Sequence, residues 1–405
     1  MSHVIVGAGL AGARTAEGLR EAGYDGEVVL LGAEEHRPYD RPPLSKDYLQ
    51  GATDQDGVFL QSAEWYGEHG VELRTGTAVA AIDRDAAEVV LADGERLGYE
   101  RLVLATGSSA RRLPVAGAEL DGVLHLRTLD DSDRLRVAIL SASRVAIIGG
   151  GWIGLEVAAA ARTAGAEVTV LEAAGQPLEA ALGPRIGAAF AELHREHGVD
   201  VRLGVHVEEI VGSGGTARGV RLADGGLVEA DIVLVSVGAA PNIGLAEAAG
   251  LDLDDGVVVD ESLRTSDPRI HAVGDIAAIW YPALGRRLRV EHWATAQNTG
   301  PVAARAVLGE SDATYDALPY FFTDQYDLGM EYTGFAGPGE ADELVVRGDL
   351  ERREFVAFWL REGRLLAGMN VNVWDVTEDI DRLVRAGGAL DTRRLADPGV
   401  PLTEL

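Results

Sequence analysis

Near its start the chain reads Val4-Ile5-Val6-Gly7-Ala8-Gly9-Leu10-Ala11-Gly12, an apolar run that leads directly into the pattern G-x-G-x-x-G. The run predicts a buried strand, and the residues after it predict a helix over 11–22. Gly7 permits a tight turn, Gly9 lets the backbone approach a pyrophosphate, and Gly12 lets the helix close onto the strand. Since a helix N-terminus offers free N–H groups and the positive end of a dipole, this stretch predicts a dinucleotide-binding site.

The same pattern returns in the middle of the chain, as Val145-Ala146-Ile147-Ile148-Gly149-Gly150-Gly151-Trp152-Ile153-Gly154. One such motif is weak evidence, because 51 of the 405 residues are glycine and an ordinary glycine turn can produce it. Its recurrence with the same strand and helix pattern favours two dinucleotide sites in one chain. Two such sites suggest electron transfer between two bound cofactors.

Each dinucleotide-binding unit is expected to place a carboxylate near the end of its second strand, where it binds ribose hydroxyls. After the strand over residues 28–31 the candidate is Glu34, with Glu35 as the alternative. After the strand over residues 168–171 the candidate is Glu172, and the next four residues supply no cation for a 2′-phosphate. The second site is therefore predicted to prefer NADH, unless Glu172 is simply a solvated acid at a strand end.

The composition excludes several functional classes. Cysteine is absent, which excludes disulfides, thiolate metal clusters and thiol redox relays. The formal net charge of −29 argues against nucleic acid and anionic membranes as partners, although a generally acidic surface explains most of the carboxylates. No transmembrane run and no secretory signal is visible, so a cytoplasmic enzyme is expected. Among 36 cationic residues, only Lys46 is a lysine.

That lysine ends the string Arg41-Pro42-Pro43-Leu44-Ser45-Lys46, and here the sequence resembles a known family. The string is typical of the FAD-dependent ferredoxin reductases that serve oxygenases, a group that includes the putidaredoxin, rhodocoxin and biphenyl-dioxygenase ferredoxin reductases. They are a branch of the glutathione-reductase-like flavoproteins with two dinucleotide sites, and apoptosis-inducing factor is a cousin. Further segments resemble the family in the expected order: Leu104-Ala105-Thr106-Gly107, Leu126-Arg127-Thr128-Leu129-Asp130, Ala272-Val273-Gly274-Asp275 and Glu291-His292-Trp293.

The resemblance implies that Lys46 and Glu156 are the catalytic residues, because in the family their equivalents form an ion pair beside flavin N5. A cation there favours the anionic reduced flavin, and the carboxylate keeps the buried lysine paired. The alternative is that Lys46 is a surface lysine at a helix start. For His292 a packing or hydrogen-bonding role is favoured over proton donation.

The resemblance also implies which residues bind the two cofactors. The residues expected to bind FAD are Gly7, Gly9, Leu10, Ala11, Gly12, Glu34, Arg41, Lys46, Ala105, Thr106, Gly107, Arg127, Asp275, Glu291, His292 and Trp293. The residues expected to bind NAD are Gly149, Gly151, Trp152, Ile153, Gly154, Glu156, Glu172 and Gly238.

The resemblance also implies an α/β fold with two Rossmann-like dinucleotide-binding domains and a small α+β C-terminal domain. The FAD domain is expected over residues 1–110 and 236–314, the NAD domain over 111–235 and the C-terminal domain over 315–405. The implied activity passes electrons from NADH through FAD to a small [2Fe–2S] ferredoxin that supplies a haem monooxygenase or a ring-hydroxylating dioxygenase. A rubredoxin reductase, a flavin NADH oxidase and a redox-sensing binding protein like apoptosis-inducing factor are the alternatives.

Two departures from the family weaken particular carry-overs. Relatives usually place the ribose carboxylate directly after the equivalent of Gly32, where this chain has Ala33. Many relatives also carry a tryptophan thought to face the redox partner, where this chain has Phe322, so the sequence leaves open whether partner choice differs.

Charge and histidine spacing give two further expectations. Arg286, Arg287 and Arg289 form a positive run just before the flavin-facing segment, and such a run would attract an acidic ferredoxin, although ordinary loop arginines look the same. His194 and His197 stand three apart without a recognisable third ligand, so no metal is predicted.

Overall fold

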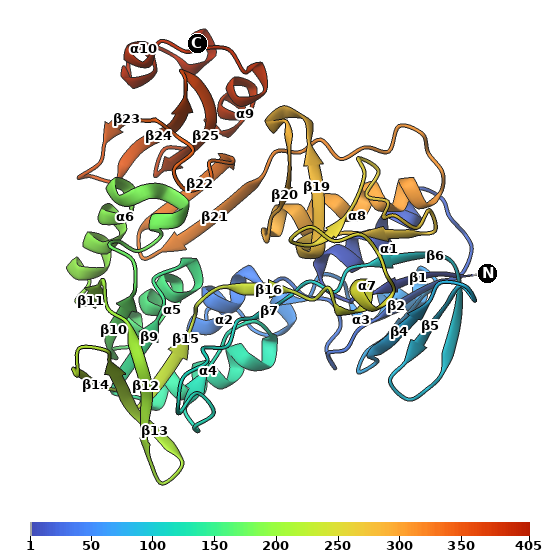
Figure 1. The fold of residues 1–405 in the computed structure, drawn as a ribbon, viewed down its shortest axis with the longest axis horizontal. Helices are drawn as coiled ribbons and strands as arrows, with labels where there is room; N and C mark the ends of the chain where they lie inside the picture. The colour runs from blue at the N-terminus through green and yellow to red at the C-terminus, as the bar shows by residue number, and fades with distance from the viewer. Residues whose placement is uncertain (1) are drawn as a thin grey trace. The chain divides into compact units, whose positions relative to one another are not determined.

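Residues 2–405 are described by a computed structural model of the chain, and they divide into two compact units. Figure 1 shows the helices and strands in chain order. Unit 1 contains the residues up to Asp40 together with Gln55–Ser109 and Ala240–Phe321. Unit 2 contains Arg41–Asp54, Ala110–Ala239 and Phe322–Leu405. None of the helices formed by residues 2–405 combines the length and the apolarity needed to cross a membrane.

Unit 1 is organised around a seven-stranded sheet in which β1 lies between β2 and β6. Parallel pairing joins β3, β2, β1, β6 and β18, and an antiparallel hairpin of β5 and β4 extends the sheet from β6. All five residues of β1 are buried, as expected for a parallel strand covered on both faces. The strands are β1 (Ser2–Val6), β2 (Val28–Leu31), β3 (Val71–Arg74), β4 (Val79–Asp83), β5 (Glu88–Leu91), β6 (Arg96–Leu104) and β18 (Ile270–Ala272).

Helices α1 (Leu10–Glu21) and α8 (Trp293–Val307) pack closely against each other within unit 1 (Figure 1). Their approach depends on glycine. A Cβ added at Gly300 would lie 2.6 Å from Arg14 Cβ, and a Cβ added at Gly18 would lie 3.0 Å from Ala304 Cβ. Because larger residues would push the helices apart, these glycines hold the middle and second half of α8 close against α1, the helix that contains the end of the first glycine motif.

The rest of unit 1 consists of short elements around this core. A three-stranded sheet contains β17 (Val257–Val258), β19 (Ala277–Tyr281) and β20 (Arg286–Arg289). The helices and 3-10 turns are η2 (Asp56–Val58), α3 (Ala63–Glu68), α7 (Gly244–Ala248), η3 (Gly274–Ile276) and η4 (Pro282–Leu284). Strands β7 (Ser108–Ala110) and β16 (Ala239–Pro241) pair where the chain leaves unit 1 and returns to it.

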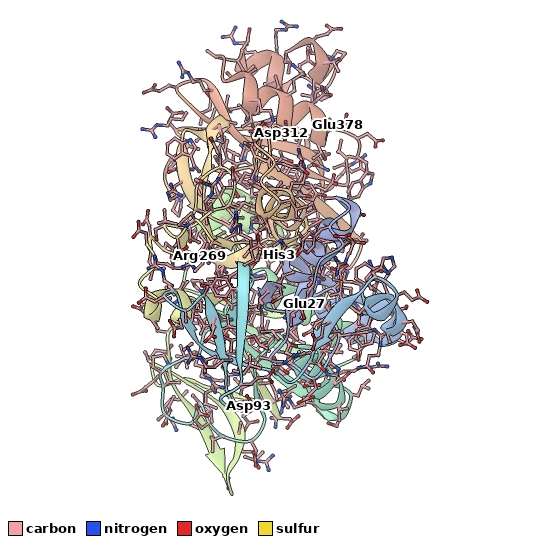
Figure 2. All side chains as sticks on the ribbon, turned by 90° about the vertical axis from the view of Figure 1, so that its right-hand side faces the viewer. His3, Glu27, Asp93, Arg269, Asp312 and Glu378 are labelled. Atoms are coloured by element: carbon pink, nitrogen blue, oxygen red, sulfur yellow. The ribbon has the colours of Figure 1, made fainter. Side chains whose placement is uncertain are left out.

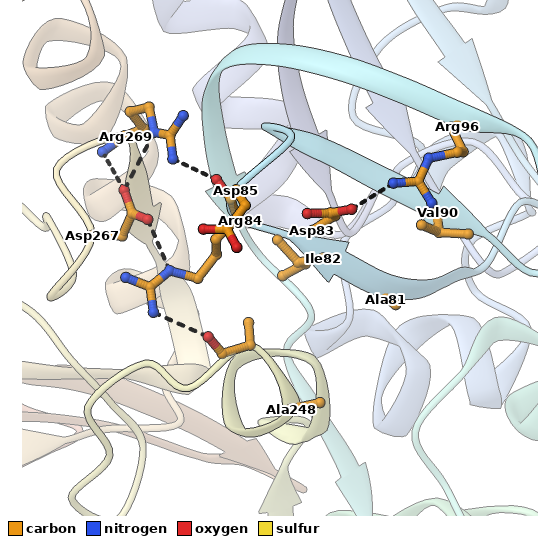
Figure 3. Close-up of a pocket in the computed structure, with 11 residues that line it drawn as sticks. Ala81, Ile82, Asp83, Arg84, Asp85, Val90, Arg96, Ala248, Asp267 and Arg269 are labelled. Atoms are coloured by element: carbon orange, nitrogen blue, oxygen red, sulfur yellow. Dashed lines mark hydrogen bonds and ion pairs between the residues drawn. The ribbon is translucent and has the colours of Figure 1, made fainter.

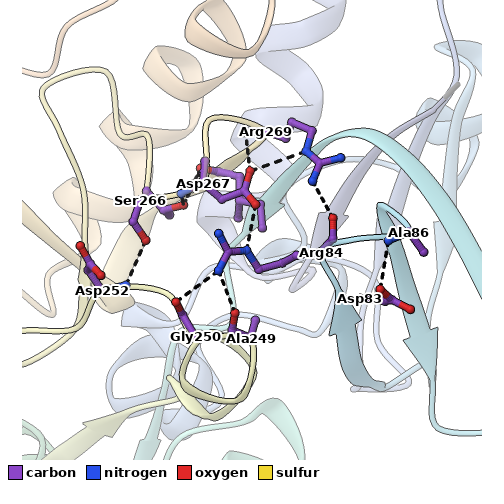
Figure 4. A network of polar contacts seen from close by, with 11 residues as sticks. Asp83, Arg84, Ala86, Ala249, Gly250, Asp252, Ser266, Asp267 and Arg269 are labelled. Carbon is purple, nitrogen blue, oxygen red and sulfur yellow. Dashed lines mark hydrogen bonds and ion pairs between the residues drawn. The ribbon is translucent and has the colours of Figure 1, made fainter.

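A polar network ties the β4–β5 hairpin to the loop before β18 (Figure 4). Asp267 accepts a hydrogen bond from Arg84 Nε at 2.9 Å and pairs with Arg269 Nε at 3.7 Å, while Arg269 donates to the Arg84 carbonyl at 2.6 Å. The same residues line a polar hollow of about 720 Å³ beside Asp83 and Ala248 (Figure 3). Since both guanidinium groups have a carboxylate partner there, the network holds the hairpin in place.

Unit 2 contains a second parallel sheet, in the order β11-β10-β9-β15-β8. Its strands are β8 (Val123–Leu124), β9 (Arg144–Ile148), β10 (Glu167–Glu172), β11 (Asp200–Leu203) and β15 (Ile232–Val235). The accompanying helices are α4 (Leu129–Ser141), α5 (Trp152–Thr163) and α6 (Glu179–Glu196). A separate antiparallel sheet contains β12 (Val207–Ser213), β13 (Thr216–Leu222) and β14 (Leu227–Glu229). The proline-rich string forms η1 (Pro42–Ser45), which leads into α2 (Asp47–Gln50).

The C-terminal segment forms a five-stranded sheet in the order β21-β22-β25-β24-β23. Its strands are β21 (Tyr320–Gln325), β22 (Leu328–Gly334), β23 (Glu343–Asp349), β24 (Glu354–Arg361) and β25 (Arg364–Val371). They are followed by α9 (Thr377–Ala386), α10 (Thr392–Ala396) and η5 (Leu402–Glu404), drawn in red in Figure 1. Two α/β sheets, one parallel and one parallel except for an antiparallel hairpin at its edge, together with a C-terminal α+β segment confirm the predicted fold class. The predicted domain boundaries stay predictions.

Acidic side chains are spread over both units. Figure 2 labels four exposed examples that lie far apart in the sequence, which are Glu27, Asp93, Asp312 and Glu378. Their wide distribution agrees with a generally acidic surface as the source of most of the net charge of −29.

Candidate functional site

The first glycine motif forms a tight turn between β1 and α1. Gly7 has a φ of +114°, and a Cβ there would lie 2.1 Å from the carbonyl oxygen of Ala105. A Cβ at Gly12 would lie 1.9 Å from the carbonyl oxygen of Gly7. Leu10 and Ala11 open α1, whose N-cap is Gly9, and no described side chain caps this helix. The turn therefore leaves backbone N–H groups available to a phosphate, as the sequence predicts.

The second glycine motif repeats this geometry in unit 2. Gly149 has a φ of +106°, and a Cβ there would lie 2.2 Å from the Ser236 carbonyl oxygen. A Cβ at Gly154 would lie 2.2 Å from the Gly149 carbonyl oxygen. Gly151 is the N-cap of α5, again without a side-chain cap among the described residues, and a Cβ there would meet no described atom within 4 Å. Space beside an uncapped helix N-terminus fits a second dinucleotide.

The two candidate ribose acids lie near the end of the strand that follows each glycine-motif helix, as predicted: Glu34 lies just beyond β2, and Glu172 is the last residue of β10. In unit 1, Glu34 accepts a hydrogen bond from the hydroxyl of Tyr39 at 2.5 Å. In unit 2, Glu172 ends β10, and its two oxygens accept hydrogen bonds from the N–H of Gly150 at 2.6 Å and of Ala174 at 2.7 Å. The structure thus brings Glu172 to the second glycine motif and fixes its carboxylate as an acceptor.

Two other predicted FAD segments meet the first glycine motif in unit 1. Gly274 has a φ of +67°, and a Cβ there would lie 3.0 Å from Ala11 Cβ, which brings the buried Asp275 close to the start of α1. Asp275 accepts a hydrogen bond from Ser108 at 3.1 Å. Thr106 and Gly107 are held by backbone and side-chain hydrogen bonds to Asn242.

The segment before α8 is fixed by polar contacts on both sides of His292. Glu291 pairs with Arg289 at 2.5 Å, and Trp293 Nε1 donates to Asp40 at 2.8 Å. The ring of His292 lies 4.5 Å from that of Phe321, between centroids. Burial lowers the pKa of His292 to about 4, so the ring is neutral at physiological pH and the packing role is favoured.

The predicted catalytic pair is formed in unit 2. Lys46, which follows η1, places its Nζ 2.8 Å from Glu156 Oε1 on α5. The side chains are 14% and 3% exposed, respectively, so the pair is shielded from water. Nearby in the chain, Arg41 Nη1 donates to the Arg127 carbonyl at 2.6 Å, which joins two more predicted FAD residues. Lys46 is thus a buried, paired lysine, which disagrees with the surface-lysine alternative.

Sequence reasoning missed two further groups on the Glu156 carboxylate. The hydroxyl of Ser45 donates to Oε2, and the hydroxyl of Thr323 in β21 donates to Oε1 at 2.5 Å. Ser45 lies inside the recognised string, so its position beside Lys46 was a usable signal. Thr323 lies 167 residues from Glu156, and no local pattern links the two.

The remaining predicted NAD residues are placed as follows. Trp152 packs edge-on against Phe190, with 5.9 Å between ring centroids, whereas Ile153 is 40% exposed at the start of α5. Gly238 has a φ of +98°, and its carbonyl accepts from the N–H of Arg111 at 2.9 Å.

Two of the three arginines of β20, Arg287 and Arg289, form contacts inside unit 1. Arg287 Nη1 donates to the carbonyls of Val259 and Ala278, each at 2.6 Å. Arg289 is paired with Glu291 and with Asp255, and its side chain is only 9% exposed. A docking role for the run stays a prediction. Within residues 2–405, no group of three or more His, Asp or Glu side chains is arranged to hold a metal ion.

Comparison with known proteins agrees with this arrangement. Residues 1–300 match the family described as pyridine nucleotide-disulphide oxidoreductase, and residues 320–405 match a reductase C-terminal domain. The chain is 44% identical to the ferredoxin–NAD(+) reductase component of an anthranilate 1,2-dioxygenase system from Burkholderia cepacia, over 98% of each chain. The chain belongs to the pyridine nucleotide-disulphide oxidoreductases, in the ferredoxin reductase branch. The family resemblance predicted from the sequence is confirmed.

Two further relatives belong to the same branch. Rhodocoxin reductase from Rhodococcus erythropolis is 41% identical over 92% of this chain and 86% of its own. The reductase in the solved covalent putidaredoxin reductase–putidaredoxin complex is 38% identical and superposes with a TM-score of 0.95, over 100% of this chain and 97% of that one.

Membership of this family confirms the predicted cofactors, FAD and NAD(H). The residues present fit both groups, because two uncapped helix N-termini follow glycine turns and open space adjoins Gly151. The individual assignments of site residues stay predictions.

Proposed function

We propose that this flavoenzyme passes electrons from NADH through FAD to a small [2Fe–2S] ferredoxin, which supplies a haem monooxygenase or a ring-hydroxylating dioxygenase. The observation that supports it best is the full-length similarity to a reductase solved together with its redox partner. The absence of cysteine supports it further, since disulfide reductases and peroxidases on related folds use reactive cysteines. We also propose that the enzyme is cytoplasmic.

Bound FAD would supply the redox chemistry, which is acceptance of a hydride from NADH and release of the two electrons one at a time. Lys46 is proposed to hold a positive charge beside the reacting ring, where it stabilises the negative charge of the reduced state. Glu156 keeps this ammonium in place, because an unpaired charge in so buried a position is strongly unfavourable. No side chain has to act as a nucleophile in this chemistry.

Glu172 is proposed to select NADH. Its carboxylate is fixed by the N–H groups of Gly150 and Ala174, so it cannot easily turn away from a ligand at the second glycine motif. It can accept hydrogen bonds from both ribose hydroxyls, whereas a 2′-phosphate would meet a fixed negative charge.

The decisive experiment is anaerobic reduction of cytochrome c by NADH and the purified holoenzyme, with and without an added [2Fe–2S] ferredoxin. A strong dependence on ferredoxin is expected. If NADH reduces the flavin and ferredoxin adds nothing, the proposed acceptor is wrong, and the yield of peroxide in air then tests for an oxidase.

The docking surface is tested separately with Arg286→Glu. At low ionic strength this variant is expected to lower the second-order rate with an acidic ferredoxin, while reduction of the flavin by NADH stays unchanged. Arg134→Glu, an exposed arginine of α4, is the control. An unchanged rate with ferredoxin would exclude docking at Arg286.

A further inference from the structure

A chain of buried side chains in unit 2 ends at the carboxylate of Glu156. Its first member is Thr323, whose hydroxyl lies 2.5 Å from Glu156 Oε1, the oxygen that also pairs with Lys46 Nζ at 2.8 Å. Gln325 Nε2 lies 3.3 Å from the Thr323 hydroxyl, and Gln325 Oε1 lies 2.9 Å from Nε2 of His194. The hydroxyl of Tyr326 lies 3.4 Å from Nδ1 of His194.

The chemistry of Glu156 fixes the direction of every hydrogen bond in this chain. A carboxylate only accepts, so the proton of Thr323 points at Glu156, and the Thr323 oxygen must accept from the amide nitrogen of Gln325. The amide oxygen then faces His194 and can only accept, so Nε2 of His194 carries a proton. Each donor therefore points toward Glu156, and each bond polarises the next one in the same sense.

The surroundings keep this arrangement intact. His194 and Thr323 are 0% exposed and Gln325 is 1% exposed, so water does not compete for their hydrogen bonds. Burial lowers the pKa of His194 to about 4, which keeps the ring in the neutral form that the chain requires. At the end of the hydrogen-bonded series opposite Glu156, the ring of His197 stacks on that of Tyr326, with 3.6 Å between centroids.

We infer that Thr323 is a positioning residue for the Lys46–Glu156 pair, held in its donating orientation by Gln325 and His194. Two of the three residues come from β21, so the C-terminal segment supplies part of the support of the predicted catalytic pair. The hydroxyl neutralises part of the charge on Oε1 and thereby sets the position of that oxygen and of the ammonium bonded to it. This inference rests on the proposed role of Lys46 in flavin reduction.

The test is Thr323→Val in the holoenzyme, because valine keeps the shape of the side chain and removes the hydrogen bond. Reduction of the flavin by excess NADH, followed anaerobically in a stopped-flow instrument, is expected to slow about tenfold at unchanged FAD content. Thr323→Ser restores the hydroxyl and is expected to restore most of the rate. Thr333→Val, at a buried threonine of β22 in the same sheet, is the matched control and is expected to leave the rate unchanged.

A double-mutant cycle with Lys46→Ala distinguishes a failure of this inference from a failure of the proposed role of Lys46 in flavin reduction. If Thr323 acts through the pair, Thr323→Val has little further effect once Lys46 is removed. A normal rate in Thr323→Val beside a slow Lys46→Ala would overturn the inference and leave the proposed role of Lys46 intact. An equal tenfold loss in both backgrounds would also overturn it, because Thr323 would then act by another route. A normal rate in Lys46→Ala would remove the pair from the mechanism, and the inference with it.

Discussion

At the scale of single residues, Lys46 shows how strongly one position can be constrained. The chain uses arginine at every other basic position, yet it keeps one lysine, with the side chain 14% exposed and bonded to Glu156. A guanidinium is planar and larger, whereas an ammonium is a compact point charge that fits a small site beside a carboxylate. This contrast supports a role for Lys46 that arginine does not fill.

Replacing Lys46 by alanine is expected to slow reduction of the flavin by NADH about 10- to 100-fold, because the positive charge that stabilises the reduced state is lost. It also leaves the charge of Glu156 buried without a cation, with only the Ser45 and Thr323 hydroxyls bonded to it, which is expected to lower the free energy of unfolding by about 3–5 kcal/mol. Stopped-flow reduction and chemical denaturation of the holoenzyme measure the two effects. Lys46→Met with Glu156→Gln serves as a control, since it should recover stability without recovering the rate.

The selectivity of Glu172 gives a second prediction at this scale. The wild-type enzyme is expected to use NADH with a kcat/KM at least about tenfold above that for NADPH, because a 2′-phosphate would meet a fixed carboxylate. Glu172→Ala combined with Ala174→Arg should narrow or reverse this ratio. Glu167→Ala, at the exposed start of the same strand, is the control and should leave it unchanged. Equal use of both coenzymes by the wild type would refute the role of Glu172.

At the scale of elements, the turn between β9 and α5 contains two glycines with different roles. The fold requires Gly154, whereas Gly151 is proposed to leave room for the ligand. In Gly154→Ala the new methyl group would lie 2.2 Å from a carbonyl oxygen, so α5 must move and the free energy of unfolding should fall by about 1–3 kcal/mol. In Gly151→Ala the methyl group meets no described atom within 4 Å, and the φ of −80° suits alanine. Its stability should stay within about 0.5 kcal/mol of the wild type.

Gly151→Ala is nevertheless expected to raise the KM for NADH about tenfold, because its methyl group fills space that the pyrophosphate needs. Thermal unfolding and steady-state kinetics on both variants distinguish the two cases. An unchanged KM in Gly151→Ala would show that the pyrophosphate does not approach this position.

The secondary-structure elements could be predicted from local sequence patterns, whereas contacts between residues far apart in the chain could not. The strands, helices and glycine turns of both motifs follow from short-range patterns, so β1, α1, β9 and α5 were predictable. The Lys46–Glu156 pair was predictable only through the family resemblance. Thr323 was not predictable, because its contact with Glu156 spans 167 residues and a threonine in a strand carries no signal of its own. The charge of the sequence also gave no sign that Arg287 and Arg289 form contacts within unit 1.

At the scale of the whole molecule, buried histidines make stability depend on pH. Burial lowers the pKa of His194 and of His271 to about 4, from an unfolded value near 6.5. Above pH 6.5 both states are neutral, and the histidines have no effect on stability. As the pH falls from 6.5 toward 4, only the unfolded chain takes up protons, so each histidine lowers the free energy of unfolding by up to about 3 kcal/mol.

The prediction is tested by urea unfolding of the holoenzyme between pH 7 and 5, with His271→Phe as the variant. His271 is 2% exposed, and neither ring nitrogen has a hydrogen-bond partner among the described residues, so phenylalanine removes the titrating group without breaking a bond. The variant should lose less stability on acidification, by about 1.4 kcal/mol per pH unit below pH 6. If His271→Phe follows the wild-type curve, His271 already takes up its proton in the folded protein, and acid sensitivity must come from other groups.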